Sequence, residues 1–300
     1  MDNLTHSLVG GLIGQAGLKK KTGLGMPALI VGANLPDIDA ACFIWLEGTE
    51  SLAFRRGITH GPPAWLLLPL VLAVLLWGFD RWQQRRGKRP EGRRPVHFGW
   101  LYGLSLIGCL THPALDWLNV YGIRLLEPFS STWFYGDTLF IIDLVLWLLM
   151  GVGLWLALRR EKRGGDGQML ARNVLGLAAL YVVANFGISV WDRTTNTSFP
   201  ETISSPPPLL FWQRESIGVG GQGSFYIDGE RVGNVSLSTC DLGAARAAEP
   251  QVDAFLFWSR APVLDRRENG SFMLSDARYY SVRESQFSTI VPARFCGDAR

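Results

Sequence analysis

The sequence has few charged residues and few cysteines, and each shortage excludes a class of protein. Charged residues make up only 18% of its 300 residues, whereas hydrophobic residues make up 48%. This balance excludes a disordered chain and a long coiled coil. Four Cys with no CxxC pair exclude a disulfide-rich framework. The class that remains is a membrane protein, and the 12 Trp agree with it because Trp favours the membrane–water interface.

Long apolar runs fill the first two thirds of the chain. Residues 62–79 carry no charge at all, which is long enough to cross a hydrocarbon layer of ~30 Å. Other runs are shorter, rich in Gly, or interrupted by His and Asp. We therefore expect a mainly α, polytopic membrane bundle with about six embedded segments. The expected segments are 4–18, 24–46, 62–79, 98–118, 138–158 and 174–191.

Lys and Arg gather in three short stretches, which predict an orientation. These stretches are 19–21, 81–94 and 159–172. With six crossings, all three fall on one side of the membrane, and the positive-inside rule makes that side cytoplasmic. We therefore expect the N-terminus and the C-terminal region outside the cytoplasm. The start of the chain has no basic region before its first apolar run, so no cleaved signal peptide is predicted.

The C-terminal third has a different composition. Residues 192–208 are polar and end in Ser-Ser-Pro-Pro-Pro, which is typical of a linker. Strands are predicted at 224–227, 252–258, 271–274 and 279–282, and the Asp-Gly and Asn-Gly pairs at 228–229 and 269–270 predict hairpins. The expected organisation is a membrane-embedded metal-site domain over 1–191, a linker over 192–208 and a small β-rich extracytoplasmic domain over 209–300.

Two cysteines fall in the expected extracytoplasmic domain. Cys240 and Cys296 would meet oxidising conditions there, so they could form a disulfide. Two free thiols are an equally good interpretation of the sequence alone.

Ionisable side chains in the apolar segments predict the functional site, because such groups are costly inside a membrane. Three of the four His follow a Thr, at His6, His60 and His112. The acidic residues of the same regions are Asp37, Asp39, Asp116, Asp137 and Asp143. In the expected topology all eight lie at a similar depth, toward the outer face. The fourth His, at position 97, lacks the Thr and lies at the cytoplasmic end.

This mixture of side chains points to a metal site. His112 and Asp116 are four residues apart, so they share one helical face. Imidazole with carboxylate suits Zn²⁺ or Mn²⁺ better than Ca²⁺, and such ions activate water and neutralise phosphoryl charge. Arg55, Arg56 and Arg124 could hold phosphate oxygens. A single His or Asp at a membrane interface is more often structural, or a helix cap, but eight together favour a metal centre.

Several of these runs resemble the YdjM-like inner-membrane proteins, a family described as metal-dependent hydrolases and also as LexA-binding. The matching runs are LTHS (4–7), ANLPDID (33–39), RRGITH (55–60), LTHPALD (110–116), NVYGIRLLEPF (119–129) and GDTLFIID (136–143). The resemblance covers residues 1–158 and extends to runs of the tail. It implies location in a bacterial inner membrane.

A more distant similarity is to the zinc-dependent phospholipase C and single-strand nuclease superfamily, whose ligands follow the order His, Asp, His, His-x-x-x-Asp. Here that order is met by His6, Asp37 or Asp39, His60, and His112 with Asp116. The resemblance implies a zinc site. The superfamily has further His ligands downstream, which this chain lacks, so one or two ions are expected instead of three.

These observations together predict a membrane-bound metal-dependent hydrolase of phosphoesters or lipid-linked phosphates. Six residues would bind the metal: His6, Asp37, Asp39, His60, His112 and Asp116. Asp137 or Asp143 would complete the ligand shell or act as base. Two alternatives remain open, namely a divalent-cation transporter and a non-enzymatic partner protein with a structural metal site. The basic loop over 81–94 is better explained by anionic lipid than by nucleic acid, so membrane lipids are the expected partners.

Overall fold

The computed structural model describes residues 1–207, 212–282 and 286–297, and the chain divides into two compact units. Unit 1 consists mainly of Met1–Ile38 and Arg56–Phe186. Unit 2 consists mainly of Asp39–Arg55, Gly187–Pro207 and Trp212–Arg300. The second unit is thus discontinuous, because a short piece of the N-terminal region belongs to it.

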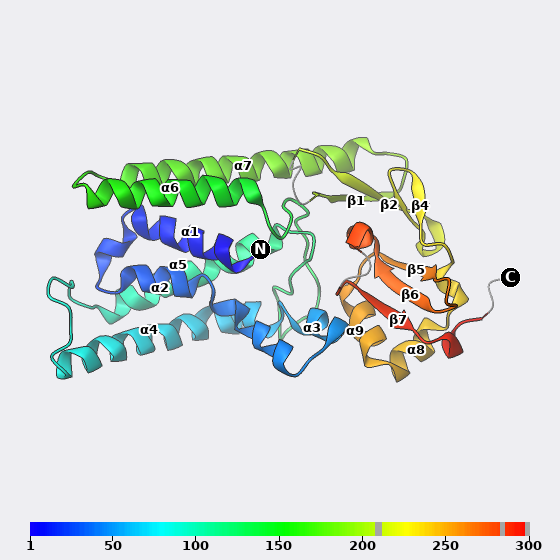
Figure 1. The fold of residues 1–300 in the computed structure, drawn as a ribbon, viewed down its shortest axis with the longest axis horizontal. Coiled ribbons are helices and arrows are strands. Elements are labelled where there is room, and N and C mark those ends of the chain that lie inside the picture. The colour runs from blue at the N-terminus through cyan, green and yellow to red at the C-terminus, as the bar shows by residue number, and fades with distance from the viewer. Residues whose placement is uncertain (208–211, 283–285, 298–300) are drawn as a thin grey trace. The chain divides into compact units, whose positions relative to one another are not determined.

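Unit 1 is a bundle of helices (Figure 1). Its helices are α1 (Asn3–Gln15), α2 (Gly25–Gly32), α4 (Pro62–Arg85), α5 (Phe98–Trp117), α6 (Leu144–Lys162) and α7 (Gln168–Thr195, which continues into unit 2). Short 3₁₀ turns include η2 (Leu35–Ile44), which runs into unit 2, and η3 (Ile58–His60). Helix α5 packs against α2 and α4, and α1 packs against α2 and α6.

Small residues bring α2 and α5 close together. A Cβ atom at Gly108 of α5 would lie 2.5 Å from the carbonyl oxygen of Leu29 on α2. Only glycine allows this approach, and close contact of backbones through small residues is how helices associate where no water drives them together. A second buried cluster joins residues of α1, α6 and α7, among them Leu12, Met150 and Val174.

The outer surfaces of the long helices are apolar. Leu67 and Leu75 on α4, Leu148 on α6 and Leu180 on α7 are all about two thirds exposed, at 60%, 64%, 67% and 64%. Leucine faces of this kind suit lipid and not water, because burying such side chains in an apolar phase is favourable.

The expectation of six membrane segments is wrong, because the described helices offer two or three candidate spans. In the described part of the chain, two helices are long and apolar enough to cross a membrane, α4 and α7. A third crossing is available if α2 and η2, which meet at a bend of 51°, count as one broken span or a re-entrant loop. Helix α1 has 13 residues, and at ~1.5 Å per residue it covers only about 20 Å of a ~30 Å layer. Helix α5 carries His112 and Asp116, and α6 ends in four charged residues, so neither is apolar over a full span.

The described part of unit 2 contains two antiparallel sheets, three short helices and the end of α7. One sheet has the order β1 (Glu201–Ser205), β2 (Glu215–Val219), β3 (Phe225–Ile227), β4 (Glu230–Val232). The other has the order β5 (Pro262–Arg266), β6 (Phe272–Asp276), β7 (Ser288–Val291). The helices are α3 (Gly48–Phe54), α8 (Leu242–Ala248) and α9 (Pro250–Trp258). A mostly helical chain with a C-terminal β region is therefore confirmed.

Both predicted hairpins are present, but two of the predicted strands are not. Asp228 and Gly229 have φ of 51° and 86° between β3 and β4, as a tight hairpin turn requires. Residues 252–258 are helical and belong to α9, because Val252, Phe255 and Trp258 are buried at a spacing of three residues. Residues 279–282 lie in a 3₁₀ turn, η6 (Ala277–Val282). The range 192–208, expected to be a linker, includes regular structure: helix α7 ends in it at Thr195, and β1 begins in it at Glu201.

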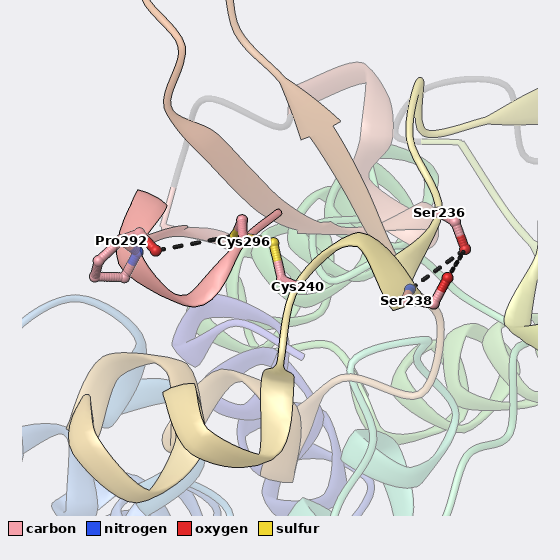
Figure 2. Close-up of a disulfide and its surroundings, with 5 residues drawn as sticks. All are labelled: Ser236, Ser238, Cys240, Pro292 and Cys296. Carbon is pink, nitrogen blue, oxygen red and sulfur yellow. Dashed lines mark hydrogen bonds between the residues drawn. A yellow bond between two sulfur atoms is a disulfide. The ribbon is translucent and has the colours of Figure 1, made fainter. Parts of the chain in front are cut away.

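A disulfide joins Cys240 and Cys296 across 56 residues of sequence (Figure 2). The two residues also form an isolated β-bridge, and Pro292 and the Ser236–Ser238 turn lie beside them. Cys42 and Cys109 are buried free thiols. The disulfide closes the end of unit 2 by tying the segment before α8 to the segment after β7.

Candidate metal centre

Five of the predicted ligands converge inside unit 1, although they come from four different elements. His6 lies on α1, Asp37 on η2, His60 at the end of η3, and His112 and Asp116 on α5. The three imidazoles and Asp116 have no exposed surface, and Asp37 is 8% exposed. Buried ionisable groups at this density need a partner of opposite charge or a metal ion.

The five residues form two groups whose ligand atoms lie within 4.8 Å of one another. One group is His6, Asp37 and His112, and the other is His60, His112 and Asp116. The shared residue is His112. Its Nε2 atom lies 3.1 Å from Nε2 of His60 and 3.7 Å from Oδ1 of Asp37. Two nitrogens bound to one tetrahedral Zn²⁺ would be about 3.3 Å apart, so the His60–His112 pair has the separation of two ligands of one ion.

Hydrogen bonds on the far side of the rings orient these two imidazoles. Nδ1 of His112 lies 2.7 Å from the carbonyl oxygen of Ala33, and Nδ1 of His60 lies 2.9 Å from Oγ1 of Thr59. A carbonyl oxygen can only accept, so His112 carries its proton on Nδ1 and presents a lone pair on Nε2. Metal-binding histidines in proteins have this arrangement. The Thr that precedes His60 thus has a direct role in holding the ring.

His6 fits the same interpretation. Its ring stacks on that of His112, with centroids 3.7 Å apart and an angle of 15° between the planes. Neither ring nitrogen of His6 has a hydrogen-bond partner among the described residues, although Nε2 lies 3.4 Å from Oδ1 of Asp116. A fully buried imidazole without hydrogen bonds is costly, and a metal ion would satisfy it. The residues present therefore fit a divalent cation.

Asp116 lies at the centre of the cluster. Its Oδ1 accepts a hydrogen bond from the Met1 amine, and its Oδ2 lies 3.5 Å and 3.6 Å from Nε2 of His112 and His60. Nε of Arg56 lies 3.0 Å from the same Oδ2 atom. Asp116 therefore combines two roles, because it faces both the imidazoles and a buried guanidinium.

Arg56 is held by its own set of contacts. Its Nη1 donates to Oδ1 of Asn119 at 2.8 Å and to the carbonyl oxygen of Gly122 at 3.2 Å, and its guanidinium lies 4.5 Å from the centre of the Tyr121 ring. Its side chain is only 6% exposed. These contacts assign Arg56 to the orientation of Asp116, whereas the sequence suggested a phosphate contact.

The other predicted site residues lie outside the two ligand groups. Asp39 and Arg55 belong to unit 2, where they pair at 3.4 Å. Arg124 pairs with Glu127 at 2.9 Å. Asp143 is the N-cap of α6: it accepts from the backbone N–H of Leu146 and from the hydroxyl of Tyr181.

The backbone of Asp137 has a left-handed conformation and lies beside the end of α5. Asp137 is buried with φ of 51°. Its two neighbours are hydrogen-bonded to the end of α5, because the N–H of Gly136 donates to Trp117 and that of Thr138 donates to Leu118. These contacts bring the Asp137 backbone beside the residues that directly follow Asp116.

Asn119 and the Ala33 carbonyl are parts of the site that sequence reasoning missed. Asn119 begins the run NVYGIR, which carried a family resemblance, but its role as the partner of Arg56 depends on a contact 63 residues apart. A backbone carbonyl leaves no signal in a sequence.

A comparison with known families identifies the family of the chain. A family described as "YdjM inner membrane protein" matches residues 1–192, a range that includes every residue of the metal cluster. No curated protein and no solved structure matches the chain.

Proposed function

The chain belongs to the YdjM inner membrane protein family, and from this premise we propose that it is a membrane-bound hydrolase of phosphoesters that uses one or two divalent metal ions. The observation that carries the proposal is the position of His112, which belongs to both ligand groups and has its Nε2 atom 3.1 Å from that of His60. Two groups with a common ligand suit two neighbouring ions, or one ion with five candidate ligands.

The metal would be bound by His6, Asp37, His60, His112 and Asp116. A bound Zn²⁺ or Mn²⁺ ion supplies a water nucleophile at neutral pH and neutralises charge on a phosphoryl oxygen. The chain's own residues prepare the site for it. The Ala33 carbonyl fixes the proton of His112 on Nδ1, and Arg56 keeps Asp116 ionised and oriented.

We assign the role of base to Asp137 on the position of its backbone. Both carboxylate oxygens of Asp143 already accept hydrogen bonds, one from a helix N-terminus and one from Tyr181, so Asp143 has a structural role. The backbone of Asp137 lies beside the end of α5, because its neighbours Gly136 and Thr138 donate hydrogen bonds to Trp117 and Leu118. In this proposal Asp137 accepts the proton of the attacking water.

The proposed orientation places the metal site and unit 2 on the extracytoplasmic side. The disulfide between Cys240 and Cys296 supports it, because disulfides persist in oxidising compartments and are rare in the cytosol. The basic stretches at 81–94 and 159–172 support it through the positive-inside rule, because both lie between the candidate spans α4 and α7, on the side opposite the segment that follows α7. A site near the outer membrane surface suits a lipid-linked phosphoester as well as a small soluble one.

Elemental analysis of the purified full chain tests the metal site. We expect one or two equivalents of zinc or manganese in the wild type, and a loss of metal in His60→Ala and in Asp116→Ala. The matched control is His97→Ala, since His97 is exposed, lies outside both groups and should leave the metal content unchanged. Metal content equal in all four proteins would refute the site.

A hydrolysis assay then tests the reaction. The wild type loaded with metal should release phosphate, or an alcohol, from synthetic phosphomonoesters, phosphodiesters or lipid phosphates, and Asp137→Asn should retain metal but lose turnover. Metal-dependent uptake of Zn²⁺ or Mn²⁺ into vesicles without hydrolysis would instead favour a transporter. Unfolding on metal removal with no turnover of any substrate would favour a structural site in a partner protein.

A further inference from the structure

A second polar feature of unit 1 lies at the junction of α6 and α7. A cavity of about 430 Å³ is lined there by Leu156, Arg159, Arg160, Arg163, Gly165 and Leu170. The three arginines and Leu156 are exposed, and Leu170 is half-buried. The cavity thus combines three guanidinium groups with an apolar wall, and it contains none of the metal-cluster residues.

The acidic residues nearest in sequence are engaged elsewhere. Glu161 accepts hydrogen bonds from Lys19 and Gln15, and Asp166 accepts from the backbone and side-chain nitrogens of Gln168. Among the described residues, no carboxylate forms an ion pair with any of the three arginines of the cavity. Their positive charge is therefore available to an anion from outside the chain.

The end of α6 holds the arginines in a defined arrangement. Leu156, Arg160 and Arg163 follow a spacing of four and three residues, so they lie along one face of the helix. Helix α6 ends at Lys162 with Arg163 as its C-cap, and Gly164 follows with φ of 81°. The N–H groups of Gly164 and Gly165 donate to the carbonyl oxygens of Glu161 and Arg160. A glycine directly after the C-cap is typical of a helix end, and it fixes the last turn of the helix.

The cavity lies where the apolar surface of both helices ends. The charge-free part of α6 ends at Leu158, and α7, a candidate membrane span, begins at Gln168. Trp155 is exposed one helical turn before Arg159, and the centre of its ring lies 5.1 Å from the Arg159 guanidinium. Exposed Trp with Arg at a helix end marks the level of the lipid headgroups.

We propose that this cavity binds an anionic phospholipid, with the arginines on the headgroup phosphate and Leu156 and Leu170 against the first part of an acyl chain. Guanidinium groups bind phosphate through paired hydrogen bonds, and basic pockets between membrane helices are suited to anionic headgroups. An apolar wall beside the arginines favours a lipid over free phosphate, because free phosphate gains nothing from leucine contacts.

Lipid binding to the purified full chain tests the proposal. The probe is phosphatidylglycerol in nanodiscs of otherwise zwitterionic phosphatidylcholine, with phosphatidylcholine alone as the reference. The variant R159Q/R160Q/R163Q should weaken phosphatidylglycerol binding at least about tenfold, since each basic residue near the surface contributes to the attraction. The matched control is R85Q/R86Q/K88Q, which removes the same charge from exposed residues of the basic loop 81–94. It should weaken binding clearly less than the cavity variant does, because it removes general attraction to the anionic surface and not the cavity.

Three further results decide between sources of the phosphate and rule out misfolding. R159K/R160K/R163K keeps the charge but loses the paired hydrogen bonds, so it should bind more tightly than the glutamine variant and more weakly than the wild type. Leu156→Gln should weaken lipid binding, whereas inorganic phosphate at millimolar concentration should not displace the lipid. Equal loss in the control variant, equal affinity for phosphatidylcholine, or displacement of the lipid by inorganic phosphate would each overturn the proposal.

Discussion

His112 donates a hydrogen bond from Nδ1 to the backbone carbonyl oxygen of Ala33, 2.7 Å away. Ala33 is the C-cap of α2, so the end of one helix sets the proton position of a candidate metal ligand on another. The ligand geometry therefore depends on how closely α2 and α5 pack. One point of close packing is Gly108, about one turn before His112.

Gly108→Ala should separate the two helices and weaken metal binding. A new Cβ would lie 2.5 Å from the Leu29 carbonyl oxygen and 2.9 Å from the Ala33 nitrogen, both backbone atoms that cannot rotate away. We expect a loss of about 1–3 kcal/mol in the free energy of unfolding, as in other overpacked contacts, with reduced metal content. Gly103→Ala is the control on the same helix, because nothing lies within 4 Å of its Cβ position. Thermal unfolding and elemental analysis measure both effects, and equal behaviour of the two variants would contradict the expectation.

Arg56→Met should destabilise the metal-free protein more than the metal-loaded one. Without the guanidinium, Asp116 becomes a buried carboxylate that lacks its closest side-chain cation, at a cost of about 3–5 kcal/mol. A bound divalent cation restores opposite charge next to Asp116, so metal should recover part of that loss. The measurement is the unfolding temperature with metal and with chelator. The control is Arg246→Met, which breaks an exposed pair with Asp253 and should cost no more than about 1 kcal/mol.

The stability of unit 2 should depend on Asp276 at acidic pH. Burial alone would raise the pKa of the Asp276 carboxyl, but the charge and hydrogen bonds of Arg278, with a hydrogen bond from Ser259, outweigh burial and hold the pKa below its usual value. The stabilisation is complete above the unfolded pKa of about 3.9 and is lost as the pH falls through the lower pKa of the folded state.

Asp276→Asn should therefore be less stable than the wild type at neutral pH, and the difference should shrink toward low pH. Denaturant unfolding at a series of pH values, followed by tryptophan fluorescence, to which the buried Trp258 contributes, measures this dependence. Asp253→Asn serves as the control, because Asp253 is exposed. A difference between Asp276→Asn and the wild type that stays constant down to pH 2 would contradict the assigned cause.

Loss of the disulfide should destabilise unit 2 by about 2–4 kcal/mol, since the bond closes a long loop in the unfolded chain. The double variant Cys240→Ser/Cys296→Ser and reduction of the wild type should have similar effects on denaturant unfolding. Cys109→Ala, at a buried free thiol in unit 1, is the control: reduction should still destabilise that variant. A wild type that is unchanged by full reduction would argue against a stabilising bond.

The local parts of the metal centre could be predicted from the sequence. His112 and Asp116 are one helical turn apart, and the three Thr-His pairs stand out in a chain with four His. The role of Arg56 could not be predicted, because it depends on a contact with Asp116 sixty residues away and on a left-handed backbone, with φ of 55°. Asp143 illustrates the opposite case, since an Asp directly before an apolar run is a typical N-cap and could have been recognised as one.

The errors in the fold have equally physical causes. A run of apolar residues does not distinguish a helix that crosses a membrane from several short helices that pack on one another, which is how α1, α2 and η2 arose from two predicted segments. Residues 252–258 contain one Val and three aromatic residues, which favour a strand, but Pro250 starts a helix and the buried positions follow the period of that helix.

The contact between α3 and α9 makes unit 2 inseparable from the N-terminal region. Thr49 donates its backbone N–H to Oε1 of Gln251 at 2.8 Å and its hydroxyl to the Gln251 carbonyl oxygen at 2.6 Å, and Gln251 donates to the Glu47 carbonyl oxygen. A protease that cuts the chain between α7 and β1 would leave the two fragments bound to each other, because residues 39–55 stay packed in the C-terminal fold. A C-terminal fragment expressed alone would expose the face of α9 that α3 covers, so truncation near residue 192 would yield two defective pieces and not two independent modules.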